Sequence, residues 1–97
     1  MYYILEDKTV KPIEDVLTWA KFVENGPRRV NKTKLPDGKW VSTIFIGVDL
    51  GFNGKPQTFE TMVFERDGME SLDCERYATW DEAQEGHEGM VAKWTQE

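Results

Sequence analysis

The single histidine and the single cysteine are the two side chains of this sequence best suited to chemistry near neutral pH. His87 could act as a base or a metal ligand, and Cys74 as a nucleophile, if the fold brings them together. His87-Glu88 is not followed by a second histidine, so the helical zinc motif HExxH is absent. A zinc site would also need two carboxylates as extra ligands, which is an uncommon set. We expect no metal site, and we keep a small-molecule or nucleotide pocket containing His87 and Cys74 as an alternative.

Two other arrangements have the residue types for chemistry but not the required pattern. Asp49 and Glu60 can face each other across a hairpin, as glycosidase carboxylates do, but 18 acidic residues make such pairs common by chance. The loop from Gly51 to Pro56 lacks the GxxxxGK[ST] spacing of a phosphate-binding loop. Its Phe52 either folds onto the core or serves as an exposed anchor for a partner. We therefore predict no catalytic, cofactor-binding or metal-binding residues, and no cofactor.

The helix that carries His87 is the best-defined element of the sequence. Thr79 and Glu82 form a capping box, which predicts a helix beginning at Thr79. Gly86 and Gly89 each cost about 1 kcal/mol inside a helix, so a bulky aromatic ring or another backbone is expected to lie close to them. Helical periodicity predicts that His87 is buried and hydrogen-bonded to a backbone carbonyl or a carboxylate. The predicted core face comprises Trp80, Ala83, His87, Met90, Val91 and Trp94.

The opposite face of this helix is predicted to be acidic. A row of carboxylates can imitate phosphates and occupy the basic, nucleic-acid-binding surface of another protein. A solubilising face is the simpler interpretation. The acidic candidates are Asp81, Glu82, Glu85 and Glu88.

A second predicted helix carries exposed aromatic candidates. Pro12 at a first helical position and Asn25-Gly26-Pro27 as a stop predict a helix of about three turns. Trp19 and Phe22 fall outside its main apolar face, so this helix is either covered on two sides or presents aromatic side chains to a partner. The broad apolar surface also permits a homodimer. The predicted core face comprises Ile13, Val16, Leu17, Ala20 and Val23.

The remaining segments predict strands, and together they define the fold class. The segments 40–50 and 58–65 alternate in polarity and are joined by a glycine- and proline-containing loop, which predicts an antiparallel hairpin. We predict an α+β fold in a single compact domain, residues 1–97: an antiparallel sheet of three to five strands with two helices packed on one face, in the order β-α-β-β-β-(β)-α. The other predicted strands are 2–5, 28–35 at an edge, and 75–78.

The net charge of −6 is unevenly distributed along the chain. Residues 65–97 carry three basic and ten acidic side chains, whereas the segment from Arg28 to Lys39 is basic. This basic stretch could contact nucleic-acid phosphates, but the acidic overall balance argues against it and favours a solvated edge strand. With no apolar run of membrane-spanning length and one cysteine, a soluble protein of a reducing compartment is expected.

Four segments resemble a family of small uncharacterised proteins encoded by bacteriophages and prophages. They are MYYIL at the start, VSTIFIGVD, FETMVF and RYATWDEAQEGHEGMV. The resemblance implies phage origin and expression in the cytoplasm of a bacterial host. It implies no catalytic residues.

The leading functional hypothesis is a non-enzymatic phage accessory protein that binds a host or phage macromolecule. Complementary charge accelerates docking and exposed aromatic side chains supply affinity, a combination that suits an inhibitor of host defence, such as an anti-CRISPR protein. The expected partner is a protein rather than nucleic acid or a membrane. The alternatives are the pocket containing His87 and Cys74, and a nucleic-acid binder using the stretch from Arg28 to Lys39.

Overall fold

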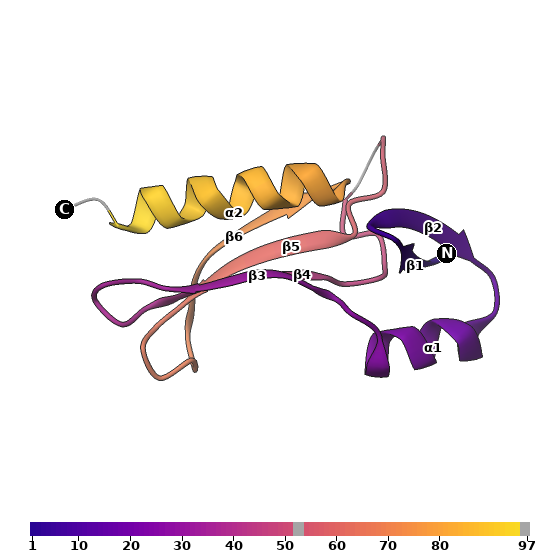
Figure 1. Ribbon diagram of the computed structural model, residues 1–97, viewed down its shortest axis with the longest axis horizontal. Coiled ribbons are helices and arrows are strands. Elements are labelled where there is room, and N and C mark those ends of the chain that lie inside the picture. Colours follow the sequence, from indigo (N-terminus) through magenta and orange to yellow (C-terminus); the bar gives the residue numbers. More distant parts are fainter. Residues whose placement is uncertain (52–53, 96–97) are drawn as a thin grey trace.

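The computed structural model describes residues 1–51 and 54–95 and has the predicted α+β class (Figure 1). A β1–β2 hairpin and the short helix α1 precede four further strands and the long helix α2, so the order is β-β-α-β-β-β-β-α. The strands are β1 Tyr2–Glu6, β2 Thr9–Ile13, β3 Arg29–Lys34, β4 Trp40–Phe45, β5 Phe59–Phe64 and β6 Ser71–Tyr77; the helices are α1 Val16–Asn25 and α2 Trp80–Thr95.

Strands β3 to β6 form an antiparallel sheet in sequence order. The predicted central hairpin is confirmed, since β4 pairs with β5 from Trp40 opposite Phe64 to Phe45 opposite Phe59. β4 ends earlier than predicted because Gly47 adopts a φ of +89°, which takes the chain out of the extended conformation. β6 begins at Ser71, earlier than predicted, and completes the sheet.

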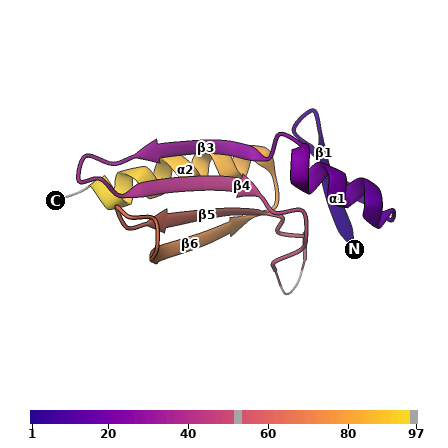
Figure 2. The ribbon, with the colours of Figure 1, turned by 90° about the horizontal axis from the view of Figure 1, so that it is seen from below.

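Helix α2 lies across one face of this sheet (Figure 1). Alternate side chains of β4 and β5 point toward the helix and are buried, as the polarity of the sequence indicates. Figure 2 looks onto the other face, which none of the described elements covers. The buried side chains beneath α2 are Val41, Thr43, Phe45, Phe59, Thr61 and Val63, with Ala83, His87 and Met90 from the helix.

Hydrogen bonds hold both ends of α2. The predicted capping box is confirmed: the Glu82 amide donates to Thr79 Oγ1 (3.1 Å), and Glu82 Oε1 accepts from the Thr79 amide (3.2 Å). Near the other end, Lys93 Nζ and Trp94 Nε1 donate to Asp73 Oδ2 on β6, at 2.8 and 2.9 Å. The hydrogen bonds from Lys93 and Trp94 lower the pKa of the Asp73 carboxyl to about 2.

His87 joins the middle of α2 to the sheet through hydroxyl groups. Its side chain is 1% exposed, as predicted, but its partners are threonines rather than a carbonyl or a carboxylate. Thr33 Oγ1 lies 2.9 Å from Nε2, and Thr43 Oγ1 lies 2.7 Å from Nδ1. Thr43 also shares a hydrogen bond with Thr61, so one network links α2 with β3, β4 and β5. Burial lowers the pKa of His87, which favours the neutral imidazole.

The prediction that a helix begins at Pro12 is wrong. Pro12 lies in β2 opposite Tyr3, and α1 begins after Asp15, whose side chain caps the Leu17 amide at 3.1 Å. Among the described strands, β2 pairs only with β1, so Pro12 occupies an edge strand, where a missing N–H is tolerated. The turn before it uses Asp7 and Lys8 at positive φ, without a glycine to signal a hairpin.

The predicted orientation and position of α1 also require correction. Val16 and Leu17, assigned to its core face, are 47% and 70% exposed. Trp19 and Phe22 face inward instead: Phe22 packs edge-on against Phe45, with ring centroids 5.8 Å apart. Helix α1 therefore packs against the β1–β2 hairpin at one end of the sheet, and α2 alone covers the sheet face (Figure 1).

Alanine substitutions at the two α2 glycines should change stability in opposite directions. A Cβ at Gly86 would collide with the ring of Tyr77, whereas a Cβ at Gly89 meets no atom within 4 Å. Gly86→Ala should therefore lower the free energy of unfolding by about 1–3 kcal/mol, and Gly89→Ala should raise it by up to about 1 kcal/mol. Urea unfolding followed by circular dichroism measures both changes; equal effects of the two substitutions would contradict the packing of Tyr77 under Gly86.

The buried neutral His87 predicts a specific loss of stability in mild acid. Its folded-state pKa lies below 6.5, so as pH falls below that value the unfolded chain takes up a proton that the folded protein resists. The free energy of unfolding should fall by up to about 1.4 kcal/mol per pH unit in this range. Even if the substitution His87→Gln is destabilising at every pH, it should make the free energy of unfolding less dependent on pH between pH 7 and 5. The measurement is the urea midpoint of each protein across that pH range. If the midpoints of wild type and variant fell in parallel with pH, His87 would not be the source of the pH dependence.

Candidate functional site

The fold separates the two residues first considered for catalysis. His87 lies between α2 and the sheet, whereas Cys74 on β6 pairs with Met62, whose side chain alternates with the buried Thr61 and Val63. Cys74 therefore lies on the face turned away from α2. A His87–Cys74 dyad cannot form across the sheet, and the packed His87 does not line an open pocket.

The local environment of Cys74 keeps its thiol protonated. The Sγ atom donates to Glu60 Oε2 at 3.3 Å, and the same carboxylate accepts from Arg76 Nε at 3.1 Å. Burial, followed by the hydrogen bond and negative charge of Glu60, raises the pKa of the thiol. A reactive cysteine needs the opposite shift, so Cys74 lacks the properties of a nucleophile.

The two carboxylates considered as a catalytic pair both have structural partners. Asp49 Oδ1 accepts from the amides of Gln57 at 2.9 Å and Gly51 at 2.8 Å. These bonds lower the pKa of Asp49 and hold the ends of the loop after β4. Glu60 forms the ion pair with Arg76. Within residues 1–51 and 54–95, no group of three or more His, Cys, Asp or Glu side chains is placed to hold a metal ion.

The aromatic candidates for partner binding are less available than predicted. Trp19 is half-buried against Tyr2, and its Nε1 donates to the Gly47 carbonyl at 3.0 Å. Phe22 packs against Phe45 in the core. Phe52 lies outside the described residues. The rings of Trp19 and Phe22 therefore fasten α1 to the rest of the protein.

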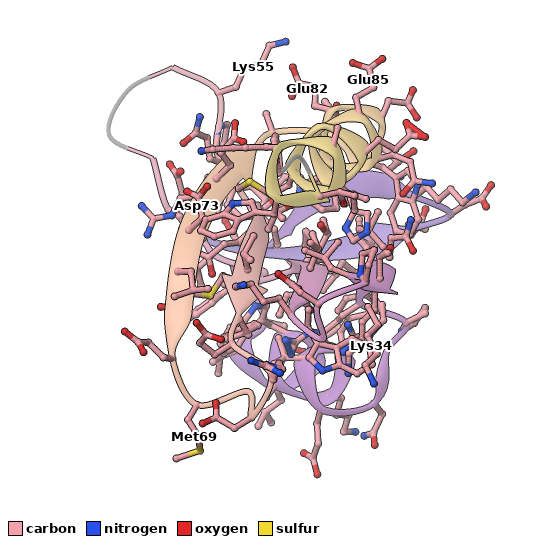
Figure 3. The ribbon with its side chains drawn as sticks, turned by 90° about the vertical axis from the view of Figure 1, so that its left-hand side faces the viewer. Lys34, Lys55, Met69, Asp73, Glu82 and Glu85 are labelled. Atoms are coloured by element: carbon pink, nitrogen blue, oxygen red, sulfur yellow. The ribbon has the colours of Figure 1, made fainter. Side chains whose placement is uncertain are left out.

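The acidic candidates on α2 are all exposed, but they differ in their contacts. Glu82 is engaged in the capping box. Asp81, Glu85 and Glu88 lie near the outward centre of the helix, and no ion pair among the described residues involves them. Figure 3 shows Glu82 and Glu85 on the outer side of α2, well separated from Lys34. We refer to Asp81, Glu85 and Glu88 as the acidic stripe.

The basic stretch divides between structural and exposed side chains. Arg28 is structural, because its guanidinium donates to the carbonyls of Val23 (2.8 Å) and Phe45 (3.1 Å). Lys39 is paired with Asp37 at 2.7 Å. Lys32 and Lys34 are exposed on β3, and no ion pair among the described residues uses them.

Strand register places these lysines beside aromatic residues on the side of the sheet away from α2. Lys34 lies opposite Trp40, and Trp40 lies opposite Phe64, so the three form one cross-strand row. The Arg29 guanidinium reaches the same face and donates to Ser42 Oγ at 3.0 Å. We call this surface the open face; its rows are Lys34-Trp40-Phe64, Lys32-Ser42-Met62-Cys74 and Arg29-Ile44-Glu60-Arg76.

A hollow of about 330 Å³ lies at the aromatic row of the open face. Lys32 Nζ stands 4.7 Å from the centroid of the Trp40 ring and Lys34 Nζ stands 5.5 Å from it, both within cation–π range. Trp40 and Phe64 were not among the residues predicted for function. The lining residues are Arg29, Lys32, Trp40, Ser42, Phe64, Arg66, Asp67 and Gly68.

A larger hollow, about 590 Å³, lies beside the start of α2. Its charged lining mixes both signs, with Lys55 and Arg76 against Glu82 and Glu85. Its one aromatic side chain, Tyr77, lies beneath Gly86. The hollow on the open face has three basic side chains against one acidic side chain, Asp67, and it has two aromatic residues.

Comparison of the chain with protein-family models, with curated proteins and with solved structures finds no match to any of the three. No helix in the described part of the chain is both long enough and apolar enough to cross a membrane. The open face and the acidic stripe are the two charged surfaces of the described residues that are candidates for binding a partner.

Proposed function

We propose that this chain is a non-enzymatic binding protein that recognises nucleic acid through the open face of its sheet. The observation that carries the proposal is the row Lys34-Trp40-Phe64, flanked by Lys32 and Arg29 on a surface that no described element covers. Lysine and arginine neutralise phosphates, and aromatic side chains stack with bases. The open face holds both kinds of group within one patch.

The net charge of −6 does not oppose this proposal once the charges are placed in space. The acidic stripe lies on the outer side of α2, and the helix itself is about 10 Å across with its side chains. Exposed charges separated by more than about 8 Å are largely screened at physiological ionic strength. A ligand on the open face is therefore affected mainly by Arg29, Lys32, Lys34 and Arg66, which outnumber the one acidic side chain of the hollow, Asp67; Glu60 is already paired to Arg76.

A binding role rather than catalysis is supported by the state of the reactive side chains. His87 is enclosed by α2 and the sheet, and its ring nitrogens are occupied by threonine hydroxyls. Cys74 is held as a thiol beside Glu60. We also propose, from the resemblance to phage-encoded proteins, that the chain acts in a bacterial cytoplasm, where an accessory protein that countered a host defence would meet nucleic acids and nucleoprotein complexes.

The acidic stripe supports a second candidate function, binding to the basic surface of another protein. Asp81, Glu85 and Glu88 are exposed and lie along one side of a single rigid helix. Their regular spacing presents negative charge as a row, which suits a surface that ordinarily contacts phosphates. This candidate uses the side of the molecule opposite the open face, so variants can separate the two.

Nucleic-acid binding should depend on the lysines of β3 and on salt. The full chain should bind a mixed-sequence oligonucleotide at low salt, more weakly as salt rises, because phosphate contacts release counterions. Lys32→Ala with Lys34→Ala should weaken binding and reduce the slope of log K against log salt by about 1 per lysine. Fluorescence anisotropy of a labelled oligonucleotide provides the measurement.

A matched control for this experiment removes two exposed lysines elsewhere. Lys21→Ala with Lys55→Ala causes the same change in net charge away from the open face. Binding by the control should stay close to wild type. The proposal fails if wild type does not bind at low salt, or if both double variants lose binding equally.

Reversing charge on the acidic stripe tests the second candidate. Glu85→Lys with Glu88→Lys should abolish recovery of a basic partner protein from phage-infected bacterial lysate, because like charges would then face each other. Glu14→Lys with Glu24→Lys, also exposed but outside α2, is the matched control and should recover the partner as wild type does. Quantitative mass spectrometry of affinity-purified samples measures recovery; identical profiles for both variants would remove this candidate.

A further inference from the structure

We infer that Trp40 and Phe64 form a stacking platform for unpaired bases, so that the nucleic acid is bound as a single strand. This inference rests on the proposed function and specifies the form of its ligand. The two rings occupy directly opposed positions on adjacent antiparallel strands. Side chains at such positions are neighbours on one face of the sheet, about 5 Å apart at Cβ. Both residues line the hollow, so a base seated there can meet either ring.

The contacts of Trp40 match the two parts of a nucleotide. Lys32 and Lys34 place their ammonium groups 4.7 and 5.5 Å from its ring centroid. Both lysine stems are flexible and exposed, so each ammonium can move from the ring to a phosphate while a base takes its place on the indole. The base then stacks on the indole in place of the cation–π contact, and the ammonium forms an ion pair with the phosphate in place of part of its hydration.

Duplex nucleic acid does not fit this surface. Bases in a duplex are stacked on one another and show only their edges in the grooves, which proteins read with an inserted helix or strand ribbon. The aromatic rings here lie on a sheet face that no described helix covers, because α1 lies beyond the end of the strands (Figures 1 and 2). Helix α2 is on the opposite face and turns its acidic stripe outward. An unpaired strand can present base faces directly to Trp40 and Phe64.

The dimensions of the open face set the length of strand that it can hold. A hollow of about 330 Å³ at Trp40 and Phe64 has room for one base beside the aromatic pair. The whole sheet is four strands wide, which at about 4.8 Å between strands gives room for two or three nucleotides. Arg29 and Arg66 lie at the same hollow, where they can contact the flanking phosphates.

The test compares ligands first, with the unmodified full chain. Anisotropy titrations use a mixed-sequence oligonucleotide of about 12 nucleotides as a single strand, as a duplex, and as an abasic strand of equal length; this length covers more than one binding site of this size. The single strand should bind at least tenfold more tightly than either of the others. Equal affinity for the abasic strand would show that phosphates alone are bound and would overturn the platform.

Variants then locate the effect. Trp40→Leu should weaken single-strand binding about five- to hundredfold, the range that base stacking on an aromatic side chain corresponds to, and Trp40→Phe should retain most of it. Phe64→Leu should weaken binding in the same direction. Trp19→Leu is the matched control: it removes a half-buried tryptophan of α1, away from the open face, and should leave affinity unchanged. Circular dichroism of each variant verifies folding.

The outcomes distinguish this inference from the function on which it rests. Salt-sensitive binding of single strand and duplex with equal affinity, unaffected by Trp40→Leu, overturns the platform but leaves nucleic-acid binding intact. Binding of neither form overturns both, and the open face would then serve a partner of another class. If Trp40→Leu does not fold, the abasic strand and Phe64→Leu still decide the question.

Discussion

The structure depends on one geometric constraint: strands send alternate side chains to both faces of a sheet, and the described residues provide a single long helix to cover one of them. The buried set from β4 and β5 meets α2, and the residues between them necessarily point the other way. Trp40, Ile44, Met62 and Phe64 are therefore left half-buried on the open face, supported by their neighbours but not covered. Most sheets of this size bury such residues or replace them with polar ones, which makes their retention informative.

On the buried side of the same sheet, a network of hydrogen bonds fixes the position of α2. His87 contacts Thr33 and Thr43, and Thr43 contacts Thr61, so the helix is placed over three strands by directional bonds as well as by apolar contacts. A shift of α2 along the sheet would leave these buried groups without partners, at a cost of about 1–3 kcal/mol for each. His87 thus has a structural role that explains a lone histidine without catalysis.

Predictions from the sequence succeeded where local signals decide structure and failed where distant contacts do. The capping box of Thr79 and the β4–β5 hairpin depend on nearby residues and were predicted correctly. The orientation of α1 depends on the contact between Phe22 and Phe45, which helical periodicity cannot predict. The aliphatic residues of the helix are more numerous, so periodicity predicted the wrong face as the buried one. The open face was missed because the pairing of Trp40 with Phe64 and Lys34 requires the strand register. The number of charges in each segment of the sequence also did not reveal that basic and acidic side chains lie on opposite sides of the sheet.

That division gives the molecule a polarity through its thickness, perpendicular to the strands. Basic groups surround Trp40 on one side, and the carboxylates of α2 occupy the other, with Glu85 on the side away from Lys34 (Figure 3). Near a negatively charged polymer, the field would rotate the protein before contact, turning the open face inward and holding α2 outward. A protein so oriented would display its acidic stripe to the surroundings while it was bound, ready to meet a second molecule without competition for the same surface.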